Sequence, residues 1–380
     1  MFMCSKNLAA LLLLSAAMMS GQDAPLDPRS SIKINLPPDS PVALMGTNVG
    51  ESRATPRGGA MVVDLHMGLS LRNSSAHRIR GITLLVLAQE MTPGGKASVA
   101  VPSLDVSPSQ AFPVRIDLRL LRPLDAGTGP LVEVRLDGVL FDDFSFYGPN
   151  RLNSRRSLTV WETEAQRDRQ FLQKTLAQGG RESLQREVIE SLARQDERPR
   201  IDVRLARGGR STAVGVPEKV KFAFLRFPDS PIDPMEGWAE ISGAEARAPR
   251  IGVVNRSNRA IRYVEIGWLV KDRQGREFLA GSVPASDGDM MLPPGAAGQV
   301  LADTTMRFSR GGGEPVAIEG MTGFVSQVEY ADGKVWVPNR SSLDNTRLLR
   351  ALAPSPEEQR LTDLYRQKGL NALIEELKKF

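Results

Sequence analysis

The chain has 380 residues, of which 41% are hydrophobic, and this is enough to bury two or three ordinary domain cores. Lysine and arginine number 49 against 44 aspartate and glutamate residues, which leaves a formal net charge of +5. Because that excess is a small difference between large numbers, we expect a mildly basic surface and not a polycation.

The first 22 residues have the order of a secretory signal peptide. Lys6 precedes an apolar run at 8–19, and small or polar residues follow at 20–22. The run is shorter than the roughly 20 residues that cross a bilayer, so we expect cleavage between Ala17 and Ala24 and no membrane span in the mature chain. We therefore predict a bacterial protein that is periplasmic or secreted.

The single cysteine, Cys4, precedes the apolar run and is removed with the signal peptide. The mature chain then has no thiol, no disulfide and no cysteine-based metal site. This composition suits an oxidising compartment, where a stray thiol is a liability.

Six short stretches recur in the same order in the two halves of the chain. The sequence Pro-Asp-Ser-Pro at 38–41 returns at 228–231, and the segment 72–80 matches 254–262. The other matches are 101–103 with 283–285, 134–138 with 329–333, 149–151 with 338–340, and 164–167 with 357–360. The spacing drifts only between 182 and 195 residues, which predicts two copies of one unit.

Each copy has the pattern of short β-strands. The runs at 82–87 and 264–269 are apolar or β-branched and follow turns of the Asn-x-Ser type. The pairs Asp137-Gly138 and Asp332-Gly333 stand between apolar alternations, so we expect each to form a hairpin turn. Many short strands with polar turns predict a β-sandwich.

Helical patterns follow each set of strands. Residues from Thr159 to Leu176 have helical spacing, the glycines at 179–180 interrupt it, and a second apolar stripe follows. In the second copy Ser355 and Pro356 give a helix start, and Gly369 separates two further stripes. We expect these stripes to pack on a sandwich in preference to a partner helix or a membrane surface.

The predicted fold class is therefore mainly β with appended α: two immunoglobulin-like β-sandwich units, each followed by a helical hairpin. The predicted segments are a signal peptide at 1–22, a first β-sandwich at 30–158, a helical hairpin at 159–196, a linker with a short strand at 197–218, a second β-sandwich at 219–346 and a C-terminal helical hairpin at 355–380.

Catalytic and metal-binding patterns are missing from the sequence. His66 and His77 are the only imidazoles, and the counterpart of His77 is Arg259, which cannot do the same chemistry. There is no G-x-S-x-G or H-E-x-x-H motif, the glycine-rich stretches at 208–212 and 311–313 lack a phosphate-gripping lysine, and Asp287 and Asp289 form only part of a calcium loop. We predict no enzyme activity, no cofactor and no metal.

The acid pairs at 142–143 and 357–358 are expected to be solvated, and the four tryptophans are expected in the core. Arginine clusters offer a candidate interaction surface for an anionic envelope component, and the alternative is that these side chains are simply solvated. Its residues are Arg151, Arg155, Arg156, Arg198, Arg200, Arg204, Arg207 and Arg210.

The segment from Ile251 to Gly275 has an Asn-rich turn, a long strand and an acidic turn with glycine. In these features it resembles the FxLYD-type immunoglobulin-like domains of bacterial envelope proteins, although the aromatic signature that names that family is absent. In the first copy the residues from Glu90 to Gly95 replace the acidic turn. The resemblance implies a binding or structural module and provides no active site.

A protein or envelope component is thus the predicted partner, and export argues against nucleic acid. A homo-oligomer joined by edge strands or helical hairpins is an open alternative. The other is a carbohydrate-binding accessory or an enzyme whose site forms only in the folded chain.

Overall fold

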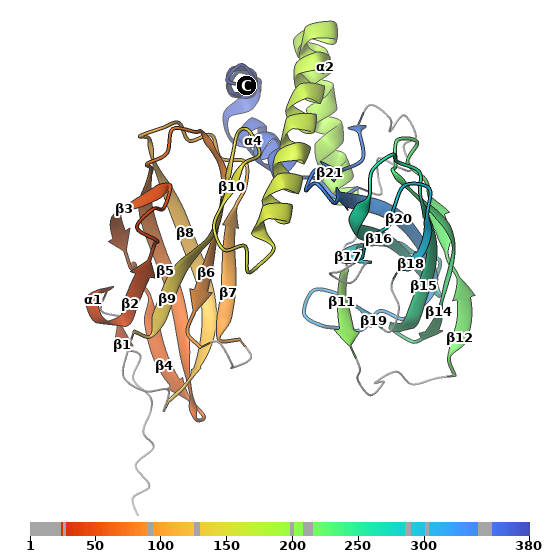
Figure 1. Ribbon diagram of the computed structural model, residues 1–380, viewed down its shortest axis with the longest axis horizontal. Helices are drawn as coiled ribbons and strands as arrows, with labels where there is room; N and C mark the ends of the chain where they lie inside the picture. Colours follow the sequence, from red (N-terminus) through yellow and green to blue (C-terminus); the bar gives the residue numbers. More distant parts are fainter. Residues whose placement is uncertain are drawn as a thin grey trace, which may run out of the picture. The chain divides into compact units, whose positions relative to one another are not determined.

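The computed structural model describes residues 24–25, 28–89, 94–124, 130–197, 201–207, 216–285, 290–300, 304–340 and 352–380 (Figure 1). The predicted signal peptide, Cys4 and the partial calcium loop at 287–289 lie outside these residues. The fold is mainly β, with several sheets and two long helices, so the predicted class is confirmed at this level.

The chain divides into two compact units. The first comprises the described residues within 1–72, 84–99 and 111–136, and the second comprises those within 73–83, 100–110 and 137–380. The boundary between them passes through strands β6 (Ile79–Leu87) and β9 (Val132–Phe141).

The described residues form four sheets, and the first of them has five strands. Its strands are, in order, β1 (Ala24–Pro25), β4 (Arg53–Arg57), β5 (Ala60–Asn73) and β3 (Val42–Asn48), with β8 (Ala111–Pro123) also paired to β5. A single helical turn, α1 (Pro28–Ser31), lies between β1 and the next strand along the chain. Buried and exposed side chains alternate along most of β5, because successive residues of a strand point to opposite faces.

The second sheet contains β6 and β9. Its order is β10 (Phe146–Tyr147), β9, β6 and β7 (Lys96–Val101), and β2 (Ile32–Asn35) pairs parallel with β9. The predicted strand at 82–87 is confirmed within β6. The predicted turn at Asp137-Gly138 is wrong, because β9 continues through both residues and the chain turns only after Phe141.

The third and fourth sheets belong to the second unit. The six-stranded sheet has the order β11 (Asp202–Arg207), β19 (Thr304–Ser309), β15 (Glu245–Asn255), β14 (Ile232–Ser242) and β12 (Glu218–Lys221), with β18 (Ala297–Val300) on β15. The five-stranded sheet has the order β13 (Ala223–Leu225), β20 (Ile318–Tyr330), β16 (Ile261–Asp272) and β17 (Glu277–Pro284), with β21 (Val335–Trp336) on β20.

The two sheets of the second unit bury their side chains in one core. Ile251 and Val253 of β15 lie in the same apolar cluster as Ile266 and Trp268 of β16. Removing this apolar surface from water is the main stabilising contribution to the unit. The predicted strand at 264–269 is confirmed within β16.

Two predictions on connections have clear outcomes. The turn at Asp332-Gly333 is confirmed, since β20 and β21 pair antiparallel across it and Gly333 has a φ of 82°. The short strand predicted in the linker is β11, which pairs with β19 at the edge of the six-stranded sheet. Because Ile201 beside it is buried, this part of the predicted linker belongs to the folded unit.

The long helices are α2 (Ser154–Glu197) and α4 (Pro356–Leu377), drawn yellow-green and blue in Figure 1. Gly180 and Gly369 leave the helical conformation with φ of 68° and 79°, at the positions where the sequence predicts interruptions. The first helix begins at Ser154 and not at Thr159, whereas the start at Ser355 is as predicted. No helix in the described ranges combines the length and apolarity that a membrane crossing needs.

The helices share an apolar cluster that is built from both copies. It contains Leu172, Leu184 and Val188 of α2 together with Leu361, Leu373 and Leu377 of α4. Each member of the first set precedes one of the second by 189 residues, the same spacing that separates Pro149 from Pro338. The sequence match of 164–167 with 357–360 is therefore displaced by one helical turn, an easy error when apolar residues repeat every three to four positions.

Candidate functional site

A buried asparagine organises the polar turn of the second copy. Asn255 is 0% exposed, and its amide nitrogen donates to the carbonyl oxygens of Arg259 at 2.8 Å and Leu292 at 2.9 Å. Its Oδ1 accepts from the backbone nitrogen of Ser257 at 2.9 Å and from the Ser257 hydroxyl at 2.7 Å. One side chain therefore fixes both the turn and a distant backbone segment.

Asn73 makes the equivalent hydrogen bonds in the first copy. Its amide nitrogen donates to the carbonyl oxygens of His77 at 2.8 Å and Val106 at 3.1 Å. Its Oδ1 accepts from the backbone nitrogen and the hydroxyl of Ser75 at 3.0 and 2.7 Å. The sequence match of 72–80 with 254–262 thus corresponds to one repeated set of contacts.

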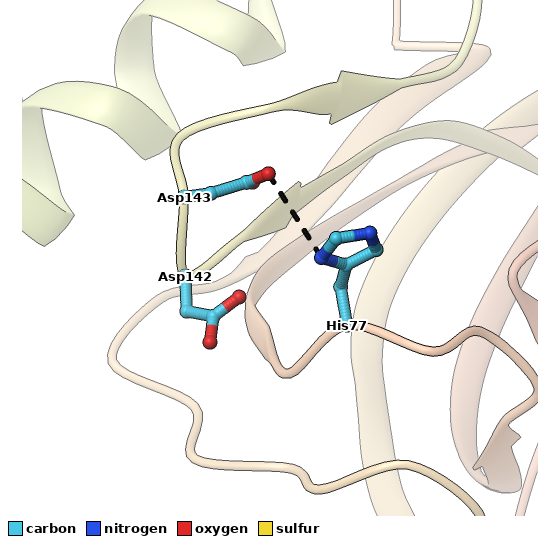
Figure 2. Close-up of side chains that lie close together, drawn as sticks. All are labelled: His77, Asp142 and Asp143. Carbon is cyan, nitrogen blue, oxygen red and sulfur yellow. Dashed lines mark ion pairs between the residues drawn. The ribbon is translucent and has the colours of Figure 1, made fainter.

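His77 lies beside two acidic residues of the turn that follows β9. Nδ1 of His77 is 3.9 Å from Oδ2 of Asp143, and Asp142 supplies a further carboxylate (Figure 2). One ligand atom from each residue lies within 4.8 Å of the others, and all three residues are exposed. The backbone nitrogen of Asp142 donates to the carbonyl oxygen of Arg78 at 3.0 Å, and this bond joins the two turns.

The second copy has a comparable surface contact at the position equivalent to His77. Arg259 occupies the position of His77 and forms an ion pair with Asp332. Asp332 is equivalent to Asp143, because the backbone nitrogen of Ala331 donates to the carbonyl oxygen of Ala260 at 2.9 Å just as that of Asp142 does to Arg78. The sequence match of 134–138 with 329–333 is therefore wrong by six residues. The Arg259 guanidinium lies 4.0 Å above the ring of Tyr330, just as the ring of His77 lies 5.8 Å from that of Phe141.

Arginine has no lone pair to offer a cation, so metal binding is not a shared property of the two positions. The hydroxyl and backbone nitrogen of Ser145 already bond to Asp143 at 2.5 and 2.9 Å, and they lower the pKa of that carboxyl. The geometry therefore fits a surface contact between turns better than a metal site.

His66 is exposed on β5, where its Nδ1 lies 3.0 Å from Oδ1 of Asp117 on the paired strand β8. The contact with His66 is the largest cause that lowers the pKa of Asp117, and Arg115 contributes to the same shift. This cross-strand pair on an exposed sheet face has the geometry of an ordinary surface interaction.

The predicted arginine surface is only partly brought together. Arg151 and Arg155 are exposed at the start of α2, and the Arg155 guanidinium lies against Gly333, where an added Cβ would be 3.0 Å from Nη2. Arg156 is half-buried, with its guanidinium 3.7 Å above the Tyr263 ring. Arg204 is exposed on β11, and Arg207 ends that strand. Arg198, Arg200 and Arg210 lie outside the described residues.

Asp137 explains why α2 starts early. It is 1% exposed, and its carboxylate accepts from the backbone nitrogens of Arg151 at 2.9 Å and Leu152 at 3.2 Å and from the Ser154 hydroxyl. A buried carboxylate that holds the chain just before a helix fixes where the helix begins. The sequence-based prediction does not include this role of Asp137, because an Asp-Gly pair is also the signature of a hairpin turn.

A buried charge network joins α2, α4 and Arg340, which lies shortly after β21. Asp168 is 0% exposed and receives two hydrogen bonds from Arg167 at 2.9 and 3.1 Å and one from the Ser355 hydroxyl at 2.6 Å, with Arg340 at 3.4 Å. Burial by itself would raise the pKa of Asp168, but these partners outweigh it and hold the pKa below its usual value.

Glu357 belongs to the same region, and the expectation that it is solvated is wrong. It is 1% exposed and bonds to Arg360 at 2.8 Å, with Arg169 of α2 at 3.8 Å. Arg169 is far away in the sequence, so no local pattern could have indicated this burial. These arginine partners offset the free-energy cost of burying the Glu357 carboxylate, which would be large if the charge were unpaired.

Of the four tryptophans, Trp268 is confirmed in the core, with 0% exposure. Trp161, Trp238 and Trp336 are half-buried. Trp161 lines a cleft of about 440 Å³ between α2 and the strands β16, β17 and β20. No local sequence pattern indicates this cleft, because its residues come from four separate segments.

No protein-family model matches the chain, and comparison with curated proteins finds no match. Among solved structures, the one titled "pT26-6p" is 8% identical, covers 88% of this chain and 72% of its own, and has a TM-score of 0.16. Pumpkin seed globulin is 11% identical with a TM-score of 0.09, covering 87% of this chain and 93% of its own. Allantoicase is 9% identical with a TM-score of 0.08, and the match covers 78% of this chain and 84% of allantoicase. TM-scores of 0.16 and below do not indicate a shared fold.

Proposed function

We propose that this chain is an exported, non-enzymatic protein of two immunoglobulin-like β-sandwich units, each followed by a helical hairpin, that binds a protein or envelope component. The main support for the proposal is that the two copies share buried contacts and differ in exposed side chains. The buried contacts of Asn73 and Asn255 are the same, whereas His77 is exchanged for Arg259. Catalysis needs particular groups in fixed positions, while a binding module keeps its frame and varies its surface.

The immunoglobulin-like part of the proposal is supported by the acidic turn after β16. Asp272 accepts hydrogen bonds from the backbone nitrogens of Gln274 and Arg276, both at 2.9 Å, and Gly275 has a φ of 79°. This is the turn in which the segment from Ile251 to Gly275 resembles the FxLYD-type domains. The shared core of the two sheets in the second unit supports the sandwich.

The partner surface that we propose lies at the start of α2. Arg151 and Arg155 are exposed there, and two cations on one edge favour an anionic partner, such as an acidic protein surface. Export would place the protein among envelope components, which include many anionic surfaces.

Site-specific photocrosslinking tests this surface in the cells that make the protein. A photoreactive residue is placed at Arg151 or Arg155, with the exposed Arg57 of β4 as the matched control position. A product of one discrete mass from the first two positions and not from the third supports the proposal. Equal labelling from all three positions, or no product from either of the first two, would contradict it.

A further inference from the structure

The cleft beside Trp161 has the composition of a ligand site. Its volume of about 440 Å³ lies within the range of about 300–1,000 Å³ for small-molecule pockets. Val160 and Trp161 of α2 provide its apolar lining, and polar side chains converge on it from the same helix and from the five-stranded sheet. These include Ser157, Glu265 and Gln327.

Contacts with neighbouring side chains hold Tyr263, Glu265 and Arg156 of the cleft in place. The Tyr263 hydroxyl donates to Oε2 of Glu265 at 2.9 Å, and the Tyr263 ring is covered by the Arg156 guanidinium at 3.7 Å. Arg156 is also 3.6 Å from Oε2 of Glu329, so its charge is matched inside the protein. The cleft therefore offers fixed hydrogen-bonding groups in place of an uncompensated positive charge.

The first copy lacks these polar residues at the equivalent positions of strand β6. Gly81 and Thr83 stand where the second copy has Tyr263 and Glu265. A Cβ on Gly81 would lie 2.7 Å from Cδ2 of Leu158, so that surface is closed by the helix. The cleft is thus a property of the second copy alone and is not required by the repeated frame.

We propose that this cleft binds a saccharide, with Trp161 packing against the C–H face of a sugar ring and Glu265 and Gln327 bonding its hydroxyls. C–H groups carry a small positive charge and suit the electron-rich face of an indole ring. Carboxyl and amide groups can bond neighbouring hydroxyls. The inference is independent of the partner proposed above, because neither Trp161 nor Glu265 is part of the arginine surface.

The state of Glu265 favours a neutral ligand. Burial raises the pKa of Glu265, against the smaller lowering effects of Tyr263 and Arg156. A carboxyl held toward its neutral form can donate as well as accept a hydrogen bond, as hydroxyl recognition requires. Glutamine at this position would keep both capacities.

The test is calorimetric titration of the mature chain with three soluble probes: maltotriose, cellotriose and the trimer of N-acetylglucosamine. We expect at least one to bind with a Kd below about 1 mM. The W161A variant should weaken that binding at least about tenfold. W238A is the matched control, since Trp238 is half-buried on β14 between Lys219 and Arg250, outside the cleft, and its binding should equal that of the parent.

Two glutamate variants separate hydroxyl recognition from recognition of a charge. E265Q should bind within about threefold of the parent, and E265A should lose about tenfold or more, because only alanine removes the hydrogen bonds. Thermal unfolding of each variant checks that it is folded, and Gln327→Ala replaces W161A if that variant is not. Failure of all three probes to bind, unchanged binding in the cleft variants, or equal loss in E265Q and E265A would overturn the inference.

Discussion

Replacing Asn255 with alanine removes the side chain that joins three backbone segments of the second unit. The amide nitrogen bonds the carbonyl oxygens of Arg259, Leu292 and Pro293, the last at 3.1 Å, and Oδ1 bonds Ser257. Each buried group left without a partner costs about 1–3 kcal/mol, and some of these groups will regain a water. We therefore expect N255A to lower the free energy of unfolding by about 3 kcal/mol.

Urea unfolding of the mature chain, followed by tryptophan fluorescence, measures this loss. Trp268 is buried in the core of the same unit and reports its unfolding. N73A should lose a similar amount, because Asn73 makes the equivalent bonds, and circular dichroism follows that transition. N35A is the control, since Asn35 makes one exposed bond to Glu133 and should change stability by less than about 0.5 kcal/mol. A loss below about 1 kcal/mol in N255A would refute the reasoning.

Three further predictions concern the helices and His77. L184A and L373A should each lower the free energy of unfolding by about 2–5 kcal/mol, because both side chains are 0% exposed and occupy equivalent positions of one cluster. The two losses, measured by urea unfolding, should be similar; a loss in only one variant would contradict the equivalence. Burial, with smaller contributions from nearby acids, raises the pKa of Glu164 to about 7 from 4.5, so the folded state binds more protons and stability falls as pH rises from 4.5 to 7. E164Q should remove that slope and gain up to about 3 kcal/mol above pH 7, as thermal unfolding against pH would show; an unchanged slope excludes this cause. H77R should change the free energy of unfolding by less than about 0.5 kcal/mol, because arginine pairs with the equivalent acid in the second copy. Zn²⁺ should not shift the melting temperature of the parent; a shift that H77R abolishes would indicate that His77 binds the metal.

Local patterns located many elements correctly. The strands at 82–87 and 264–269, the turn at Asp332-Gly333 and the helix start at Ser355 were all predictable from the sequence. The turn and the helix start depend on interactions within a few residues, such as the Ser355 hydroxyl that accepts from the backbone nitrogen of Glu358 at 3.0 Å. The two strands are recognisable from their apolar runs, although the strands they pair with lie far away in the sequence. Short-range contacts of this kind can be predicted directly from residue type and spacing.

The same local pattern failed where a distant partner decides the outcome. Asp137-Gly138 has the hairpin signature, yet Asp137 is buried in a strand because backbone nitrogens at 151 and 152 bond its carboxylate. Glu357 was expected in solvent, yet Arg169 of the other long helix lies beside it. Burial of a charged group depends on which partners the fold brings near, and spacing along the chain does not reveal them.

The repeat, the strand and helix patterns and the absence of recognised catalytic motifs can all be read from the amino-acid sequence, since they follow from residue type and spacing. Folding of the chain established which repeated residues are equivalent: Leu172 with Leu361 and Leu184 with Leu373, inside one cluster. It also brought Trp161, Glu265 and Gln327 to one cleft from a helix and two strands. Such groups meet only when the apolar faces of several segments are buried together, and that packing is a property of the whole chain.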